Sequence, residues 1–211
     1  MENLSMDELT NQYYDVLKEL GNIGAGNATT ALAQMIGCKV DMSVPQVQLL
    51  DFSQLGDSLG SEEEIMVGIY LGVDGDISGS MMFIQKKVSA ANLVNKLMCG
   101  MLGVVDETII HAEFGEMECS AIMEVGNIIT GAYLNALSTL TNLKIYPSVP
   151  QLAIDMASAL LSVPAVEFGL FADKILLVQT KFSDDIELDG HFILIPDMES
   201  YEKILKALGV M

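Results

Sequence analysis

Two polar pairs in this chain have residue types and a spacing that could do chemistry on a protein surface. Glu19 stands three residues before Asn22, and Glu124 stands three residues before Asn127. At about 100° per residue on an α-helix, such a spacing puts both side chains on one face. An amide donates and accepts hydrogen bonds, so it can hold a water molecule in a line of attack, while a carboxylate can dock on a cation. Phosphoryl transfer needs little beyond this positioning when another molecule supplies the metal ion and the phosphoryl group.

The two pairs belong to a longer pattern that occurs twice. A short polar residue stands four residues before each glutamate, and a proline follows each asparagine after 22 intervening residues. These further positions are Asp15 and Ser120, and Pro45 and Pro150. Each member of the first copy lies 105 residues before its counterpart in the second. This agreement predicts an internal repeat, with copies at about residues 6–100 and 106–211.

The alternative interpretation of each pair is a solvated helix face that carries a surface charge and a tolerated amide. Asparagine is a poor helix former, because its side chain competes for the backbone. Neighbouring positions also change between the copies, from Lys18 to Met123 and from Leu20 to Val125, whereas the Glu and the Asn are kept. A merely solvated face has no reason to keep them, so the repeat favours a functional role.

The elements that must position these side chains follow from hydrophobic periodicity. Apolar and small residues recur every three or four positions from about Met6 to Ile36, which predicts one long helix, and residues 112–142 repeat it. The apolar stripe becomes small in the middle of the first helix, which predicts close approach by the second long helix. The small residues are Gly24, Ala25, Gly26 and Ala28. The Glu and Asn side chains are expected on a different face from this stripe.

Each long helix is followed by a strand with the proline, a hairpin and a second helix. The expected ranges are 38–51, 65–73, 77–85 and 88–98, then 143–154, 174–182, 190–195 and 200–208. We expect each proline at a bulge or a sheet edge, because it cannot donate a ladder hydrogen bond. Residues 52–64 are acidic and Gly/Ser-rich and predict a loop, and residues 156–172 are expected to be its more apolar counterpart.

The predicted fold class is therefore α+β. We expect a single domain over residues 1–211, in which two copies of helix, strand, hairpin and helix join their antiparallel strands across a pseudo-twofold axis. The two long helices are expected to pack together on one face of the joined sheet.

Composition argues against several classes of partner. A formal charge of −19, with only 10 Lys and Arg residues, argues against binding to nucleic acid or to an anionic lipid surface. The longest apolar run, at 157–171, contains Pro164 and Glu167 and is too short to cross a bilayer, so we expect no membrane insertion and a cytoplasmic protein. Three cysteines without a C-x-x-C pair predict neither a disulfide framework nor a metal site.

Three weaker signals favour structural roles. Residues 21–26 read G-x-x-G-x-G and follow no strand, so they do not match a dinucleotide-binding loop. His111 and His191 have no carboxylate or cysteine partner nearby in the sequence. Cys119 has no basic neighbour in the sequence that would activate the thiol, so we expect a core thiol.

The pattern [Asp/Ser]-x3-Glu-x2-Asn-x22-Pro resembles that of the CheC/CheX/FliY family of bacterial chemotaxis phosphatases, and the resemblance covers nearly the whole chain. Two intact copies within 211 residues most resemble the CheC members of that family. The resemblance implies hydrolysis of the aspartyl-phosphate of the response regulator CheY. That regulator keeps its own Mg²⁺, so no cofactor or metal is expected on this chain.

The resemblance also implies a role for each motif residue. Asn22 and Asn127 would orient the attacking water, and Glu19 and Glu124 would pair with a lysine of the regulator. The remaining motif positions, Asp15 and Ser120, would support the interface. CheD, the receptor-modifying glutamine deamidase, is implied as a second partner.

Two other functions stay open. The first is a non-catalytic interaction module, similar to the motor-switch proteins that share the fold and bind a partner without hydrolysis. The second is a weak phosphatase whose main task is to bind CheD and whose activity rises in that complex. Because a scaffold needs surface shape and not an amide aimed at water, the presence of both Glu and Asn in each copy favours the enzyme.

Overall fold

The computed structural model describes residues 6–37, 41–42, 46–50, 59, 61, 63–102, 113–168, 175–183 and 188–209. The first half contains α1 (Met6–Ile36), β1 (Asp41–Met42), β2 (Gln46–Leu50), β3 (Ile65–Gly75), β4 (Gly79–Lys86) and α3 (Lys87–Leu102). The second half contains α4 (Glu116–Thr141), β5 (Ile145–Pro147), β6 (Gln151–Met156), α5 (Ala157–Phe168), β7 (Ile175–Ser183), β8 (Leu188–Pro196) and α6 (Met198–Ala207). Apart from α5, the described elements of the second half follow the order of those in the first.

The described strands all join one antiparallel sheet in which each half completes the other. The order along the sheet is β1-β7-β8-β4-β3-β5, with β2 also on β7 and β6 also on β3. The edge strands β1 and β2 thus pair with the hairpin of the second half, and β5 and β6 pair with the hairpin of the first. In the middle, β4 pairs with β8, and Met82 lies opposite Ile193, the residue 111 positions later. The predicted α+β class with a joined antiparallel sheet is confirmed.

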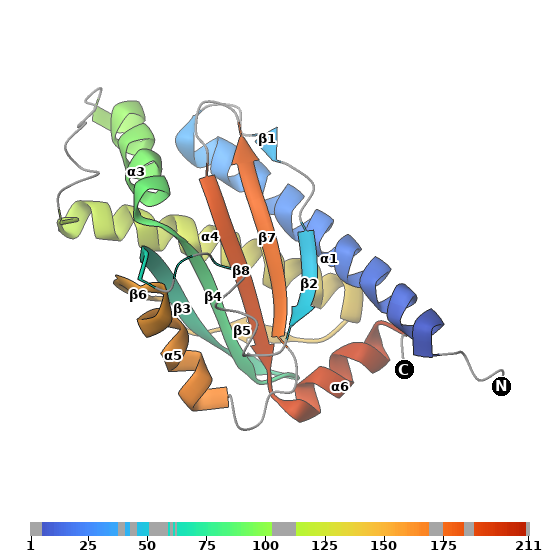
Figure 1. The fold of residues 1–211 in the computed structure, drawn as a ribbon. Helices are drawn as coiled ribbons and strands as arrows, with labels where there is room; N and C mark the ends of the chain where they lie inside the picture. Colours follow the sequence, from blue (N-terminus) through green and yellow to red (C-terminus); the bar gives the residue numbers. More distant parts are fainter. Residues whose placement is uncertain are drawn as a thin grey trace.

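Helices cover both faces of this sheet, as Figure 1 shows. The larger core places α1, α3, α4 and α6 against one face, where Ile69, Phe83 and Phe192 point toward them. The smaller core lies on the other face, where Leu160 and Leu161 of α5 pack with strand residues such as Ile193. The prediction that both long helices pack on one face of the sheet is confirmed.

Three details differ from the sequence-based expectation. The second long helix begins at Glu116 and not at residue 112, since residues 113–115 are not helical. Residues 157–168 form α5 and not a loop, because their apolar side chains are needed to cover the second face of the sheet. The first hairpin also turns later than expected, because Asp74 and Gly75 continue β3 and pair with β5, so that the turn falls at residues 76–78.

Pro150 lies at a sheet edge, as we expected. It stands between the edge strands β5 and β6, which both pair with β3. Three residues separate Pro147 from Gln151, whereas two separate their β3 partners, Val73 and Tyr70, so the edge carries one extra residue, as in a bulge. Pro45, His111 and Cys38 lie outside the described residues, as does most of the loop expected at 52–64.

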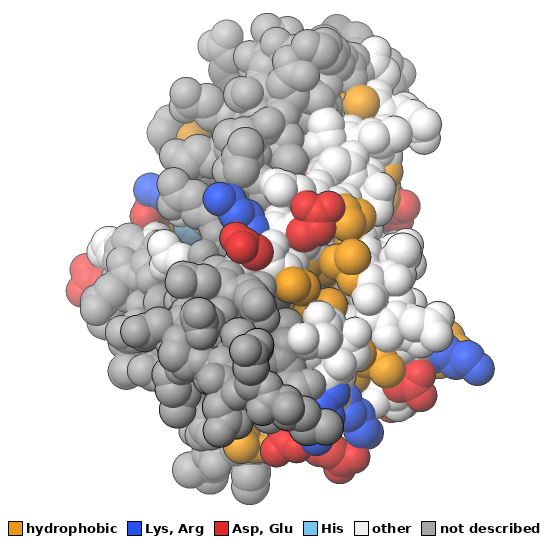
Figure 2. Space-filling model, turned by 90° about the vertical axis from the view of Figure 1, so that its right-hand side faces the viewer, with side chains coloured by type: hydrophobic (Ala, Val, Ile, Leu, Met, Phe, Trp, Pro, Cys, Tyr) orange, Lys and Arg blue, Asp and Glu red, His pale blue; other side chains and the backbone are white. Residues whose placement is uncertain are grey.

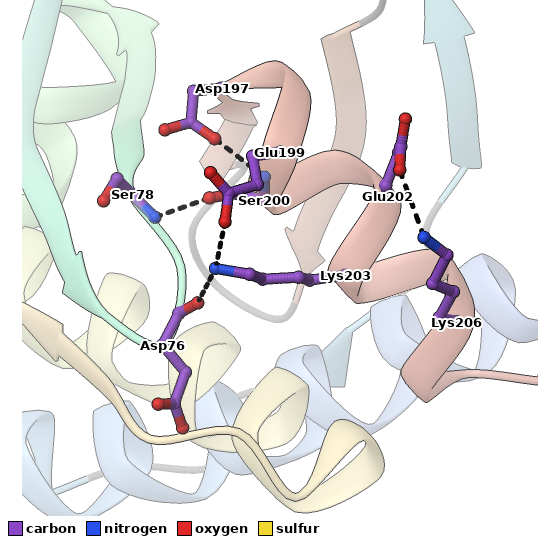
Figure 3. Close-up of polar contacts among 8 residues, drawn as sticks. All are labelled: Asp76, Ser78, Asp197, Glu199, Ser200, Glu202, Lys203 and Lys206. Atoms are coloured by element: carbon purple, nitrogen blue, oxygen red, sulfur yellow. Dashed lines mark hydrogen bonds and ion pairs between the residues drawn. The ribbon is translucent and has the colours of Figure 1, made fainter.

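Polar contacts hold the start of α6 against the first hairpin turn (Figure 3). Asp197 caps the helix by accepting a hydrogen bond from the Ser200 backbone N–H at 2.7 Å, and the Ser200 hydroxyl accepts one from the Ser78 N–H at 2.7 Å. Lys203 forms an ion pair with Glu199 at 2.8 Å. The Ser78–Ser200 hydrogen bond, together with one from Lys203 Nζ to the Asp76 carbonyl oxygen at 3.3 Å, joins the closing helix of the second half to the hairpin of the first.

The described residues on the side drawn in Figure 2 form no basic patch. On the side drawn in Figure 2, hydrophobic side chains form a band in the middle, and the few lysines stand apart, each near acidic side chains. Within the described ranges, no helix combines the length and the apolar character that a membrane crossing requires.

Candidate active site

The first Glu–Asn pair lies on the exposed side of α1. Asp15, Glu19 and Asn22 are all exposed, whereas the Leu20 side chain, between them in sequence, is only 3% exposed. A helix of 31 residues holds these three side chains within two turns on one face. The predicted grouping of Asp15, Glu19 and Asn22 on one solvent-facing surface therefore agrees with the structure.

The second pair repeats this arrangement on α4. Ser120, Glu124 and Asn127 are exposed, while Val125 and Gly126 between them are buried. Two further acidic residues, Glu116 and Glu118, lie in the first turn of α4, where the helix dipole favours negative charge. Both faces thus offer a carboxylate and an amide on rigid backbone, open to a macromolecular partner.

Direct contact with the sheet fixes the turn of α4 that carries Asn127. A Cβ added at the preceding residue, Gly126, would lie 2.9 Å from Cγ2 and 3.0 Å from Cγ1 of Ile69, and closer still to Cδ1. The buried Thr130 hydroxyl donates to the Gly126 carbonyl oxygen at 2.7 Å and also approaches the Asn127 carbonyl oxygen at 3.2 Å. Gly126 therefore lets α4 approach β3 closely enough to set the height of Asn127 above the sheet.

The turn of α1 that carries Asn22 rests on α4. A Cβ added at Gly24 would overlap the ring of Tyr133, which is itself stacked on Phe192 of β8 with ring centroids 4.2 Å apart. The expected close approach of the two long helices therefore occurs at Gly24. It does not extend to Gly26, which is exposed and has no neighbour within 4 Å of an added Cβ. That part of the prediction is wrong, because Gly26 points away from the helix contact.

The two Glu–Asn pairs form separate sites and not one composite cluster. The helices α1 and α4 run in roughly opposite directions across the sheet (Figure 1). Gly24 of α1 meets Tyr133 of α4, and Asn127 lies six residues before that contact, about 9 Å along the helix axis. With opposite directions, the two motif-bearing halves point to opposite ends of the helix pair.

Chemistry at either site would depend on the partner. Among the described residues there is no group of three or more His, Cys, Asp or Glu side chains that could hold a metal ion. His191 is buried in β8, and the half-buried Cys119 thiol contacts the Phe114 carbonyl oxygen at 3.7 Å, so both have structural surroundings. Neither adjoins the Glu or Asn of the motif in the sequence. What each site offers is an amide and a carboxylate, which can position water and bind a cation but do not make a strong nucleophile.

The fold belongs to a class already seen in bacterial flagellar and chemotaxis proteins. The structure of FliY from Thermotoga maritima superposes with a TM-score of 0.71 at 21% identity, covering 99% of this chain and 98% of that one. At that level of identity, the match shows a shared fold.

Sequence comparison then shows the family. The model of the CheC-like family matches residues 14–49 and 117–154, and each segment contains one Glu–Asn pair. The CheY-P phosphatase CheC of Bacillus subtilis is 38% identical over 198 residues, which are 92% of this chain and 93% of that protein. The flagellar motor switch phosphatase FliY of the same organism is 28% identical over 149 residues, 71% of this chain and 37% of that longer protein. The chain belongs to the CheC-like family.

Proposed function

We propose that this protein is a phosphatase that removes the aspartyl-phosphate from the response regulator CheY, with one site on α1 and one on α4. The observation that carries the proposal is that Glu19 and Asn22 are exposed together on one helix, and Glu124 and Asn127 on another. The opposite side of each helix is buried. The 38% identity to a CheY-P phosphatase supports the same substrate. Such a partner would be met in the cytoplasm.

The division of labour follows from what each side chain can do. The Asn22 or Asn127 amide accepts a hydrogen bond from the attacking water and aligns it with the phosphorus atom. The Glu19 or Glu124 carboxylate pairs with a lysine of the regulator, which fixes the register of the two proteins. Mg²⁺ stays on the regulator and neutralises charge on the phosphoryl oxygens. Asp15 and Ser120 lie four residues before the glutamates and extend the polar contact.

The decisive experiment follows the decay of phosphorylated CheY with wild-type protein, Asn22→Ala, Asn127→Ala and the double variant. Loss of one preorganised amide should cost on the order of 10²-fold at its own site. Each single variant should therefore keep the activity of the other site, and the double variant should lose nearly all of it. Asn27→Ala and Asn135→Ala are matched controls, since both remove an exposed amide from the same helices outside the motif.

A non-catalytic interaction module is the second candidate, because an exposed carboxylate and amide on a helix can also bind a partner without hydrolysis. The relation to a flagellar motor switch phosphatase favours the enzyme. The non-catalytic function predicts that the wild type does not accelerate the decay of phosphorylated CheY. It also predicts that the double variant still binds CheY, once circular dichroism has shown that the variant is folded. Accelerated decay that survives in the folded double variant would also exclude the amide mechanism.

CheD is the further partner that we propose, and family resemblance is its only support. A weak phosphatase that mainly binds CheD would show low activity alone and a higher rate with CheD added. Measuring CheY-P decay with and without CheD separates this function from an independent phosphatase, whose rate would not change.

A further inference from the structure

A groove opens beside the α4 site, where α1, α3 and α4 meet. Its volume is about 450 Å³. Five lining residues are apolar, namely Met35, Leu97, Met98, Met117 and Ala121. The other two are Ser120 and Glu124, so the groove is continuous with the second copy of the motif. We call it the methionine groove.

The methionine groove lies within reach of any protein that engages Asn127. Met117, Ser120, Glu124 and Asn127 follow one another at spacings of three or four residues, so they form a single stripe along α4. Met117 and Asn127 are ten positions apart, which is about 15 Å along the helix axis. A standard interface buries roughly 800 Å² per partner, a patch of about 16 Å radius, so a partner centred on Asn127 also covers the groove.

The groove has the composition of an interface centre and not of a solvated surface. Met117 is 59% exposed although it is a large apolar residue, and Met98 and Met35 are half-buried. Methionine side chains are flexible and polarisable, and they are used at surfaces that must fit a partner's side chains. Water against such a surface is displaced favourably by an apolar group.

The first copy lacks the same apolar residues at the matching positions. The counterpart of Met117, 105 residues earlier, is Gln12, and the counterpart of Met98, 111 residues later, is Gly209. Gly209 follows the end of α6 at Ala207, whereas Met98 lies inside α3. Two of the apolar lining residues of the methionine groove are therefore specific to the α4 site.

We propose that the methionine groove receives an apolar side chain of the phosphorylated receiver domain when that domain is bound at α4. This inference rests on the proposed function. It adds a residue group that determines affinity for the receiver domain at the α4 site. The Glu124 carboxylate and the groove would act together, one on a lysine of the receiver domain and the other on an apolar side chain near it. The α1 site would bind the same domain through polar contacts without this anchor.

The test isolates the α4 site by placing every variant in an Asn22→Ala background. In that background, Met117→Gln and Met98→Gln should each raise KM for phosphorylated CheY about tenfold, the effect of losing an anchoring apolar contact. The maximal rate should stay within about twofold, because neither side chain reaches the attacking water. Met198→Gln, which removes an exposed methionine from α6, is the matched control and should leave KM unchanged.

Two outcomes would overturn the proposal. One is an unchanged KM for both groove variants in the Asn22→Ala background. The other is an equal rise of KM in an Asn127→Ala background, where turnover reports only the α1 site. Of the two variants, Met117→Gln changes a mostly exposed side chain, so misfolding does not obscure its result.

Failure of the proposed function would be visible separately. If the double Asn→Ala variant keeps full turnover, the phosphatase mechanism is wrong whatever the groove does. The role of the groove is then tested by a binding assay alone. The ligand is CheY carrying Mg²⁺ and beryllium trifluoride as a stable mimic of the phosphoryl group. Weaker binding of Met117→Gln in that assay supports the anchor, and unchanged binding rejects it.

Discussion

Gly126→Ala should destabilise the protein, although alanine is the better helix former. The new Cβ would lie 2.9 Å and 3.0 Å from two carbon atoms of Ile69, whose side chain is fully buried and branched at Cβ. Overpacking of this kind costs about 1–3 kcal/mol. The gain in helix propensity offsets about 1 kcal/mol of that. Because Cδ1 of Ile69 is closer still, the cost falls in the upper part of that range, about 2–3 kcal/mol. We therefore expect a net loss of about 1–2 kcal/mol in the free energy of unfolding.

Gly131→Ala is the matched control on the same helix. A Cβ at Gly131 meets nothing within 4 Å, so only the helix propensity changes, and the variant should gain about 1 kcal/mol. For a chain of 211 residues, 1 kcal/mol shifts Tm by about 2–4 °C. Thermal unfolding followed by circular dichroism should therefore place Gly126→Ala below the wild type and Gly131→Ala above it.

A double-mutant cycle identifies the atoms responsible. Ile69→Val removes Cδ1, the nearest atom to the added Cβ, so it should relieve part of the clash. Ile69→Val alone costs about 0.5–1.5 kcal/mol, but in the Gly126→Ala background it should cost clearly less, a coupling of about 1 kcal/mol. Equal stabilisation by Gly126→Ala and Gly131→Ala would refute the reasoning, as it would mean that α4 does not rest on Ile69 at this turn.

The other predictions concern α1 and α6. Gly24→Ala should lower Tm because the added Cβ overlaps an aromatic ring of α4. Gly26→Ala has open space around the added Cβ and should raise Tm by about 2–4 °C. Similar Tm shifts in the two variants would contradict the helix contact. The hydrogen bond to Glu199 raises the pKa of Lys203 above its usual 10.5. The small stabilisation by this ion pair is therefore present at neutral pH, and it is lost as the pH rises through the raised pKa. The difference in Tm between wild type and Lys203→Met should therefore shrink above pH 10.5, and a difference that grows there would reverse the assigned sign.

Much of the site could be predicted from sequence because its signals are local. The first long helix begins and ends where periodicity indicated, at Met6 and Ile36, since no proline or polar break interrupts the pattern. Exposure of Glu19 and Asn22 follows from the same period once Leu20 and Gly24 are assigned to the core. A helix face is set by residues within two turns, so sequence spacing is enough to find it.

The features that sequence missed depend on contacts between distant segments. The helix α5 has apolar residues on most sides and contains Pro164, so it shows no amphipathic period, and only the uncovered second face of the sheet explains why it forms. The contact between Gly126 and Ile69 joins residues 57 positions apart, and nothing local marks which glycine needs the space. Gly24 and Gly26 look alike in the sequence, yet only Gly24 touches the other helix.

The exchange of edge strands makes the two sites parts of one cooperative structure. Because β2 pairs with β7 and β6 pairs with β3, neither half holds a complete sheet under its own long helix. The larger core likewise takes residues from both halves, including Leu20 of α1 and Val125 of α4. A substitution that loosens one helix therefore lowers the folded population that carries both sites. Loss of turnover at one site can be assigned to its amide only when the activity of the other site, measured in the same molecule, is unchanged.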